Sequence, residues 1–137
     1  MTQKISAVII TFNEERHIGR CLQSVAGIAD EIVVVDSFSS DATKARCLPY
    51  DVQFFEHAFE SYIAQKNWAL QKAAYPVVLS LDADEALSDE LRRTIANIKC
   101  DWRADGYFFS RTTFLGAKPI RHGAWYPDYK LRLFDKR

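Results

Sequence analysis

Several features that mark large classes of protein are missing from this chain of 137 residues. No apolar run approaches the roughly 18 residues that a membrane-spanning helix needs, and residues 1–4 lead straight into a strand-like segment, so we expect no membrane span and no signal peptide. The 18 basic and 18 acidic side chains cancel, which leaves no overall positive field and argues against a nucleic-acid partner. Only three cysteines are present, an odd number with no CxxC spacing. We therefore expect small, buried, reduced thiols in a cytoplasmic protein.

The common phosphate-binding and nucleophile signatures are absent as well. No GxGxxG follows the first strand-like run and no GxxxxGK[ST] occurs anywhere, which excludes a dinucleotide fingerprint and a P-loop. No GxSxG elbow is present, and His17, His57 and His122 lack a recognisable partner spacing. We interpret these histidines as surface or packing residues.

The composition that remains, 48% hydrophobic and 26% charged, fits one globular domain. Short apolar β-rich runs alternate with helical patterns in the first 100 residues, and this alternation predicts an α/β fold with a mainly parallel sheet. We expect strands over 5–11, 31–36, 52–57 and 77–81. The first helix should follow an N-cap at Asn13, carry an apolar stripe over 18–25 and stop at Gly27, and further helices should lie over 42–48, over 62–74 and after a cap at Ser88. The aromatic-rich segments 106–115 and 129–134 alternate in hydrophobicity, which indicates an antiparallel excursion after residue 100.

Polar residues stand at the ends of three of the expected parallel strands, as Thr11-Phe12-Asn13-Glu14, Asp36-Ser37 and Asp82-Ala83-Asp84-Glu85. A parallel sheet brings such strand ends to one edge, where ligands bind. Asp82 and Asp84 could place oxygen ligands on one Mg²⁺ or Mn²⁺. The plainer alternatives are that these acids end the strand by chance, that Asp36 caps a turn over 37–40, and that Glu14 is a helix N-terminal acid.

Five segments together resemble the family 2 inverting glycosyltransferases of the GT-A fold, and within them the lipopolysaccharide-core glucosyltransferase group. They are ISAVIITFNEERHIGRCLQSV, DEIVVVDSFSSDAT, SYIAQKNWALQKA, VVLSLDADEALSDEL and HGAWYPDYKLRLF. The resemblance implies one GT-A domain over 1–137, with the nucleotide-sugar part in 1–100 and the start of the acceptor-side part in 101–137. Members usually continue beyond the RLF segment, so the acceptor-side part would be incomplete.

The resemblance also implies a reaction: transfer of a sugar, expected to be glucose, from a UDP-linked donor to a saccharide or glycolipid acceptor of the cell envelope. Such an enzyme is cytoplasmic or peripheral to the inner face of the membrane. Its implied donor-site residues are Thr11, Phe12, Asn13, Glu14, Asp36, Ser37, Gln65, Lys66, Asn67, Asp82 and Ala83. Asp84, with Asp82, would hold the metal, and Asp128 would be the base that deprotonates the acceptor. Trp125 and Tyr126 could form a sugar-stacking platform.

Other functions compete with this one. In a HAD-type phosphohydrolase Asp82 would be the nucleophile and Asp84 the acid, although Ala86 stands where that motif has Thr or Val. A receiver-like α/β module and a donor-binding fragment without turnover are further alternatives. Six basic and two acidic residues give 118–137 a net charge of +4, which in a monomer would suit an anionic acceptor. We also expect a homodimer formed through residues after 100, because uncovered aromatic-rich strands favour association.

Overall fold

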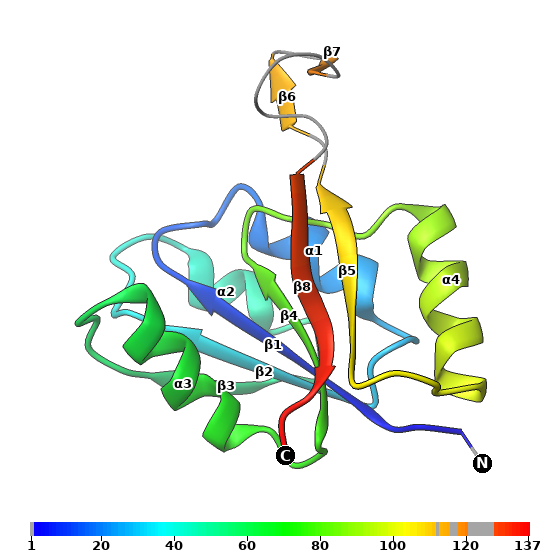
Figure 1. Cartoon of the computed structure of the whole chain (residues 1–137). Coiled ribbons are helices and arrows are strands. Elements are labelled where there is room, and N and C mark those ends of the chain that lie inside the picture. The colour runs from blue at the N-terminus through cyan, green and yellow to red at the C-terminus, as the bar shows by residue number, and fades with distance from the viewer. Residues whose placement is uncertain (1, 112, 116–117, 121–127) are drawn as a thin grey trace.

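A computed structural model describes the backbone of residues 2–111, 113–115, 118–120 and 128–137, and the side chains of residues 2–107 and 132–137. Within these residues six strands form one sheet in the order β3-β2-β1-β4-β8-β5, and two short strands pair separately (Figure 1). The strands are β1 (Ile5–Thr11), β2 (Glu31–Asp36), β3 (Gln53–Glu56), β4 (Val77–Asp82), β5 (Gly106–Arg111), β6 (Thr113–Leu115), β7 (Lys118–Ile120) and β8 (Asp128–Asp135).

Helices cover both faces of the parallel part of this sheet, as Figure 1 shows. They are α1 (Ile18–Val25), α2 (Thr43–Cys47), α3 (Tyr62–Lys72) and α4 (Asp89–Cys100). The residues of β1 alternate between two apolar clusters. Ile9 packs with residues of α1, α2 and α4 on one face, and Val8 packs with α3 residues on the other. Burial on both faces explains why β1 is a continuous apolar run rather than an alternating one.

The pairing register aligns the polar strand ends that the sequence singled out. β1 is parallel to both of its neighbours, with Thr11 opposite Asp36 of β2 and Ile10 opposite Asp82 of β4. The predicted α/β fold with a mainly parallel sheet is therefore confirmed, and the loops that follow β1, β2 and β4 leave the sheet at one edge.

The antiparallel segment differs from the prediction. The expected strand over 106–115 is two strands, β5 and β6, and β6 pairs with β7 outside the main sheet. β8 lies between β4 and β5 and runs antiparallel to both. The physical reason is burial: Leu133 of β8 is fully buried in one apolar cluster and Phe134 packs against the other. β8 thus pairs the edge of β4 that would otherwise be exposed.

Asn13 is not an N-cap, so that prediction was wrong. Helix α1 begins only at Ile18, with His17 as an N-cap that makes no side-chain cap bond. Asn13 instead adopts a left-handed φ of 50°, and its Oδ1 accepts a hydrogen bond of 2.8 Å from the Ser40 N–H. Asparagine tolerates this conformation and readily bonds to a nearby turn, which here comes from another loop. The expected cap at Ser88 is confirmed by its bond from the Leu91 N–H (3.1 Å).

Two smaller expectations also fail. Helix α3 ends at Lys72 rather than at residue 74. Cys21 and Cys47 are buried as expected, but Cys100, at the last turn of α4, is exposed. Among the residues that the structure describes, no helix has both the length and the apolar character needed to cross a membrane.

Candidate active site

A cleft of about 530 Å³ opens where the ends of β1 and β4 meet α3. This volume lies within the range of small-molecule sites, about 300–1,000 Å³. The cleft is lined by Ile10, Thr11, Phe12, Glu14, Ser37, Phe59, Tyr62, Gln65, Asp82, Ala83 and Asp84. Most of the residues predicted for the donor site therefore lie around one cavity.

The other predicted residues lie beside the cleft. Lys66 and Asn67 line a smaller depression of about 260 Å³, which shares Ile10 with the cleft. Lys66 still reaches the cleft wall, because its Nζ lies 3.7 Å from Asp82 Oδ1. Asn13 and Asp36 are not part of the described lining and instead shape the loops around it.

Asp36 caps the turn that follows β2, which was one of the two roles that the sequence left open for it. Its side chain is 2% exposed, and its carboxylate accepts hydrogen bonds from both the Ser39 N–H, at 2.8 Å, and the Ser39 hydroxyl. The Ser39 hydroxyl oxygen also accepts from the Asn13 N–H at 2.7 Å. Asp36 thereby ties the loop after β2 to the loop after β1, and a bond from Asp36 to a nucleotide base stays a prediction.

Gln65 holds the α3 wall of the cleft in place through hydrogen bonds to the loops that follow β2 and β3. The residue is 1% exposed, and its Nε2 donates to Ser37 Oγ (3.1 Å) and to the His57 carbonyl (3.2 Å). Its Oε1 lies 2.8 Å from His57 Nδ1, and the His57 ring stacks on Trp68 at 4.1 Å between centroids. Because a buried amide needs partners on both sides, these bonds fix α3 against the ends of β2 and β3.

The acidic wall of the cleft is a tight turn after β4. The Glu85 N–H donates to the Asp82 carbonyl at 2.9 Å, which turns the chain back immediately after the strand. Asp82 lies between two cations, with Lys66 Nζ 3.7 Å from one carboxylate oxygen and Arg132 Nη2 3.8 Å from the other. Asp84 is exposed at the cleft. The two carboxylates therefore differ: Asp82 lies beside two cations of the protein, and Asp84 faces solvent.

The outer rim of the cleft is aromatic. Phe12 is 56% exposed, Phe59 49% and Tyr62 71%, and the rings of Phe59 and Tyr62 meet edge to face at 5.2 Å between centroids. Exposed aromatic rings at a cleft can stack on a nucleobase or on the apolar face of a sugar. Phe59 and Tyr62 were not predicted from the sequence, since nothing in their spacing separates them from core aromatics.

Comparison with known proteins identifies the family. Residues 6–136 match the family model described as glycosyl transferase family 2. The chain belongs to glycosyl transferase family 2. This membership confirms the resemblance drawn from the sequence and decides against the phosphohydrolase and the receiver-like module.

Curated relatives of this family 2 chain include an uncharacterized glycosyltransferase of Rickettsia conorii, 39% identical over 107 residues. That alignment covers 78% of this chain and 38% of the relative. The lipopolysaccharide core biosynthesis glycosyltransferase LpsC of Rhizobium meliloti is 36% identical over 99 residues, which cover 69% of this chain and 36% of LpsC. The chain thus spans less than two fifths of the length of either relative.

Solved structures confirm the GT-A fold of this family 2 chain. The crystal structure of S. aureus TarS 1–349 superposes with a TM-score of 0.59 at 27% identity, covering 76% of this chain and 34% of that one. The same protein has been solved with UDP, where the TM-score is 0.54 at 28% identity over 70% of this chain and 32% of that one. Its complex with UDP-GlcNAc superposes with a TM-score of 0.59 at 26% identity, covering 76% of this chain and 33% of that one.

The base predicted for the family 2 reaction, Asp128, is the first residue of β8 and pairs with Arg111 of β5. The β4–β8 register, with Leu79 opposite Leu133, carries the start of β8 past the carboxyl end of β4. The backbone of Asp128 therefore lies toward the cleft edge of the sheet. Its side chain, and all of Trp125 and Tyr126, lie outside the described residues.

The metal-binding prediction can be tested against the residues that are present. Across the described residues no group of three or more His, Cys, Asp or Glu side chains is placed to hold a metal. Mg²⁺ and Mn²⁺ commonly bind through one or two carboxylates and complete their shell with water and phosphate oxygens, so Asp84 and Asp82 fit this type of ion. Thr11 Oγ1 in the cleft wall is buried with no partner among the described residues, which fits a site built around polar ligands.

Cys21 packs beneath the turn as a buried thiol. Its thiol lies 3.7 Å from the Asp82 carbonyl, to which it donates. Burial, followed by the carboxylates of Glu85 and Asp84, raises the pKa of this thiol to about 12. The neutral thiol therefore supports the turn by packing and by this weak hydrogen bond.

Two charged residues of the site, Glu85 and Arg132, were not predicted. Arg132 comes from β8, and its Nη2 lies 2.9 Å from Glu85 Oε2. Both side chains are largely buried, 8% and 14% exposed. Glu85 was visible in the acidic motif and Arg132 in the RLF segment. Their contact depends on β8 pairing with β4, which local patterning does not reveal.

Proposed function

We propose that this chain binds a nucleotide-diphospho-sugar in the cleft and transfers its sugar to a saccharide or glycolipid acceptor with inversion. Glucose is the proposed sugar, uridine the proposed nucleoside, and lipopolysaccharide or another cell-envelope glycan the proposed product. The observation that carries the proposal is the convergence of the Thr11, Ser37 and Asp82–Asp84 segments on one cleft with an aromatic rim. Further support comes from family membership, from LpsC and from the UDP complex of TarS.

In this proposal the nucleoside occupies the part of the cleft between the β1 and β2 ends. Thr11 offers a buried hydroxyl without a partner among the described residues, and Ser37 is held toward the cleft by Gln65. Phe12, Phe59 and Tyr62 would shield the base or the sugar from water by stacking. Lys66, beside Asp82, would meet a phosphate of the donor as a point charge.

The departing nucleoside diphosphate carries negative charge that must be stabilised as the glycosidic bond breaks. Asp84, with Asp82, would hold Mn²⁺ or Mg²⁺, which supplies that stabilisation when bound. Asp84 is the stronger candidate ligand, because Asp82 already lies between Lys66 and Arg132. Asp82 would lie nearer the ribose side of the donor.

The acceptor must approach from the face opposite the leaving group, where a base takes up its hydroxyl proton. Asp128 is proposed for this role, since its backbone starts β8 at the cleft edge of the sheet. In a monomer, the net charge of +4 over residues 118–137 would favour an anionic acceptor, such as a phosphorylated saccharide at the inner membrane surface.

The donor-binding part of the proposal predicts a specific loss in Asp84→Asn. Titrations with UDP, GDP and dTDP, each with and without Mn²⁺, should give tightest binding for UDP with Mn²⁺. Asp84→Asn should abolish the gain in UDP affinity that Mn²⁺ confers, because the neutral amide is a poor ligand for this hard cation. Thermal unfolding should be unchanged, since the side chain is exposed.

Asp89→Asn is the matched control, because Asp89 is an exposed acid in the first turn of α4 outside the described cleft lining. Equal Mn²⁺-linked affinity in Asp84→Asn and the parent would remove Asp84 from the metal site. Release or transfer of sugar from UDP-glucose with Mn²⁺ then distinguishes an active transferase from a donor-binding fragment without turnover.

A further inference from the structure

Glu85 closes the turn that carries the two aspartates. Its main-chain N–H donates to the Asp82 carbonyl at 2.9 Å, and its side-chain Oε1 accepts from the Asp82 N–H at 2.8 Å. Both polar groups of the Asp82 main chain are therefore bonded to one residue. If the Glu85 carboxylate moved away, the Asp82 N–H would lose its acceptor, and the turn would no longer be held in this conformation.

Arg132 fixes the other oxygen of that carboxylate. Its Nη2 donates to Glu85 Oε2 at 2.9 Å, its Nη1 donates to the Ser80 carbonyl at 3.4 Å, and the residue is 7% exposed. Removing Arg132 takes a cation away from the largely buried Glu85 carboxylate, which costs free energy away from water. The pair spans 47 residues of sequence.

Neither residue belongs to the described lining of the cleft. In the proposed donor site, Asp82 and Asp84 would therefore contact the ligand, and the Arg132–Glu85 pair would support them from outside the cleft. Residues that bond to metal-binding carboxylates orient them in many proteins. Here the supporting guanidinium comes from β8, in the antiparallel half of the sheet, and holds a turn at the end of the parallel half.

We infer that the Arg132–Glu85 ion pair is a positioning element, which holds the Asp82–Asp84 turn in the shape needed for metal-linked nucleotide binding. The expected effect of the ion pair on metal-linked binding rests on the proposed function. Its expected effect on the conformation of the turn does not. The ion pair thus gives the antiparallel half of the sheet a role in the donor site, in addition to any contact with the acceptor.

Two measurements on the full chain test this inference. The first is amide hydrogen exchange at Asp82, followed by NMR without ligand. The second is the Mn²⁺ concentration that gives half-maximal gain in UDP affinity. Glu85→Ala and Arg132→Met should each speed Asp82 exchange and raise that Mn²⁺ concentration by about tenfold or more, with a much smaller change in UDP affinity without metal.

Arg132→Lys serves as the conservative variant, and it keeps the test possible if Arg132→Met does not fold. It restores the charge but not the two-pronged donor, so partial recovery of both readouts is expected. The double variant Glu85→Ala with Arg132→Met should be no worse than the stronger single variant, because both changes remove one shared interaction.

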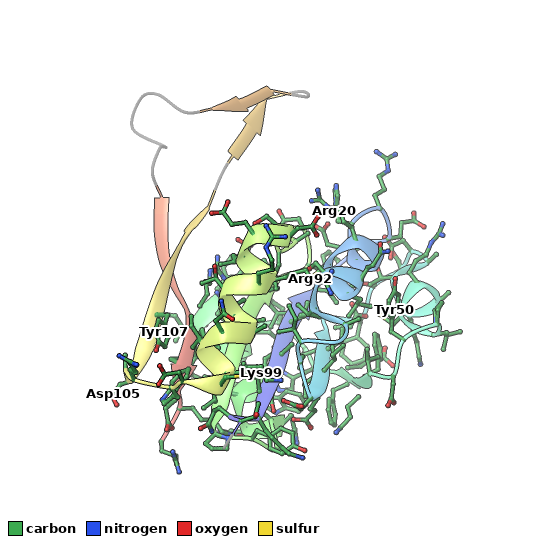
Figure 2. The ribbon with its side chains drawn as sticks, turned by 90° about the vertical axis from the view of Figure 1, so that its right-hand side faces the viewer. Arg20, Tyr50, Arg92, Lys99, Asp105 and Tyr107 are labelled. Carbon is green, nitrogen blue, oxygen red and sulfur yellow. The ribbon has the colours of Figure 1, made fainter. Side chains whose placement is uncertain are left out.

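Lys99→Met is the matched control. Lys99 forms an ion pair of the same length, 2.9 Å to Asp30. This pair lies where β1 and β2 begin, at the opposite end of the strands from the cleft. Figure 2 shows Lys99 far from Arg20, whose guanidinium donates to the Asp84 carbonyl at 3.2 Å. This variant should lower thermal stability and leave Asp82 exchange and the Mn²⁺ requirement as in the parent, once rates are compared at equal stability.

Asp82 exchange in Arg132→Met that equals that of Lys99→Met would overturn the inference, and so would faster exchange with an unchanged Mn²⁺ requirement. A parent protein with no Mn²⁺-linked UDP affinity would count against the proposed function instead. In that case, Asp82 exchange in Glu85→Ala and Arg132→Met that equals exchange in the parent still overturns the positioning role. Faster exchange in these variants supports the role of the ion pair in holding the turn.

Discussion

At the scale of single residues, the three cysteines illustrate how burial sets reactivity. Burial raises the pKa of Cys21 to about 12 and that of Cys47 to about 11, whereas Cys100 is exposed. Because the thiolate is the reactive form, only Cys100 should react rapidly with a thiol reagent near neutral pH in the folded protein. Cys21 and Cys47 should react after denaturation.

Counting labelled thiols by mass spectrometry, before and after denaturant is added, checks this expectation. Cys100→Ser should abolish the rapid reaction and provides the control. Rapid labelling of Cys21 in the native protein would mean that the chain beneath the acidic turn opens more readily than its burial implies.

Asp36 is 2% exposed and lies outside the described lining of the cleft, so its proposed bond to the base depends on the lone pairs that Ser39 leaves unused. Its carboxylate accepts two bonds from Ser39, yet each oxygen keeps a second lone pair that could accept the imide N–H of uracil. The corresponding ring nitrogen of cytosine has no hydrogen to donate. Asp36→Ala should therefore weaken UDP binding by about 1–3 kcal/mol and reduce the preference for UDP over CDP.

Calorimetric titration of UDP and CDP measures both effects. Ser39→Ala is the control for loss of the turn contacts, because it removes the hydroxyl and keeps the carboxylate. It should weaken both nucleotides alike. If Asp36→Ala binds UDP as tightly as the parent does, Asp36 only caps the turn.

At the scale of elements, a polar network joins the beginning of the sheet to the α3–β4 connection. Fully buried Ser6 of β1 donates its hydroxyl to Glu31 of β2, and its Oγ accepts the Tyr75 N–H at 3.1 Å. The same Glu31 oxygen accepts the Ala74 N–H at 2.8 Å. Ser6→Ala leaves the Tyr75 N–H without its acceptor and removes one of the two bonds to the Glu31 oxygen, so the free energy of unfolding should fall by about 1–3 kcal/mol.

Urea unfolding, with an unchanged slope and a lower midpoint, measures this loss. Thr94→Ala is the comparison variant. Its hydroxyl bonds to the Glu90 carbonyl on an exposed part of α4, so its removal should change the free energy of unfolding by less than about 0.5 kcal/mol. Equal losses in the two variants would show that the Ser6 network contributes little.

Local patterning predicted the parallel half of the sheet because its signals are contained within each element. The runs at β1, β2 and β4 are apolar on both faces, and Ser88 caps α4 through its own neighbour Leu91. The convergence of strand ends at the cleft follows from parallel pairing alone. The site residues found in this way are those that sit at strand ends.

Contacts between distant elements could not be predicted in the same way. The place of β8 depends on which strand edge remains free, and the Arg132–Glu85 pair depends in turn on β8. Asn13 illustrates the same limit on a smaller scale, since its side chain bonds to the Ser40 N–H of another loop rather than to its own helix. In each case the two partners lie far apart in the sequence and are brought together only by the tertiary fold.

At the scale of the whole molecule, the sheet has two edges in the part of the chain that the structure describes, β3 and β5. β3 has four residues, whereas β5 has six with the sequence GYFFSR. A longer, apolar edge strand offers unpaired N–H and C=O groups to a second copy of itself. We therefore expect a two-fold dimer that pairs through residues after 100, with β5 at its centre.

Light scattering at several protein concentrations measures the mass directly, and a dimer should approach twice the chain mass of 15.7 kDa. Phe109→Lys on β5 should shift the mass toward the monomer, because a charge on an edge strand opposes pairing with its own copy. Leu48→Lys replaces a residue that is 77% exposed at the end of α2 and should leave the dimer intact. A monomer at every concentration would contradict the dimer. It would also favour the alternative in which the basic segment 118–137 faces an anionic acceptor.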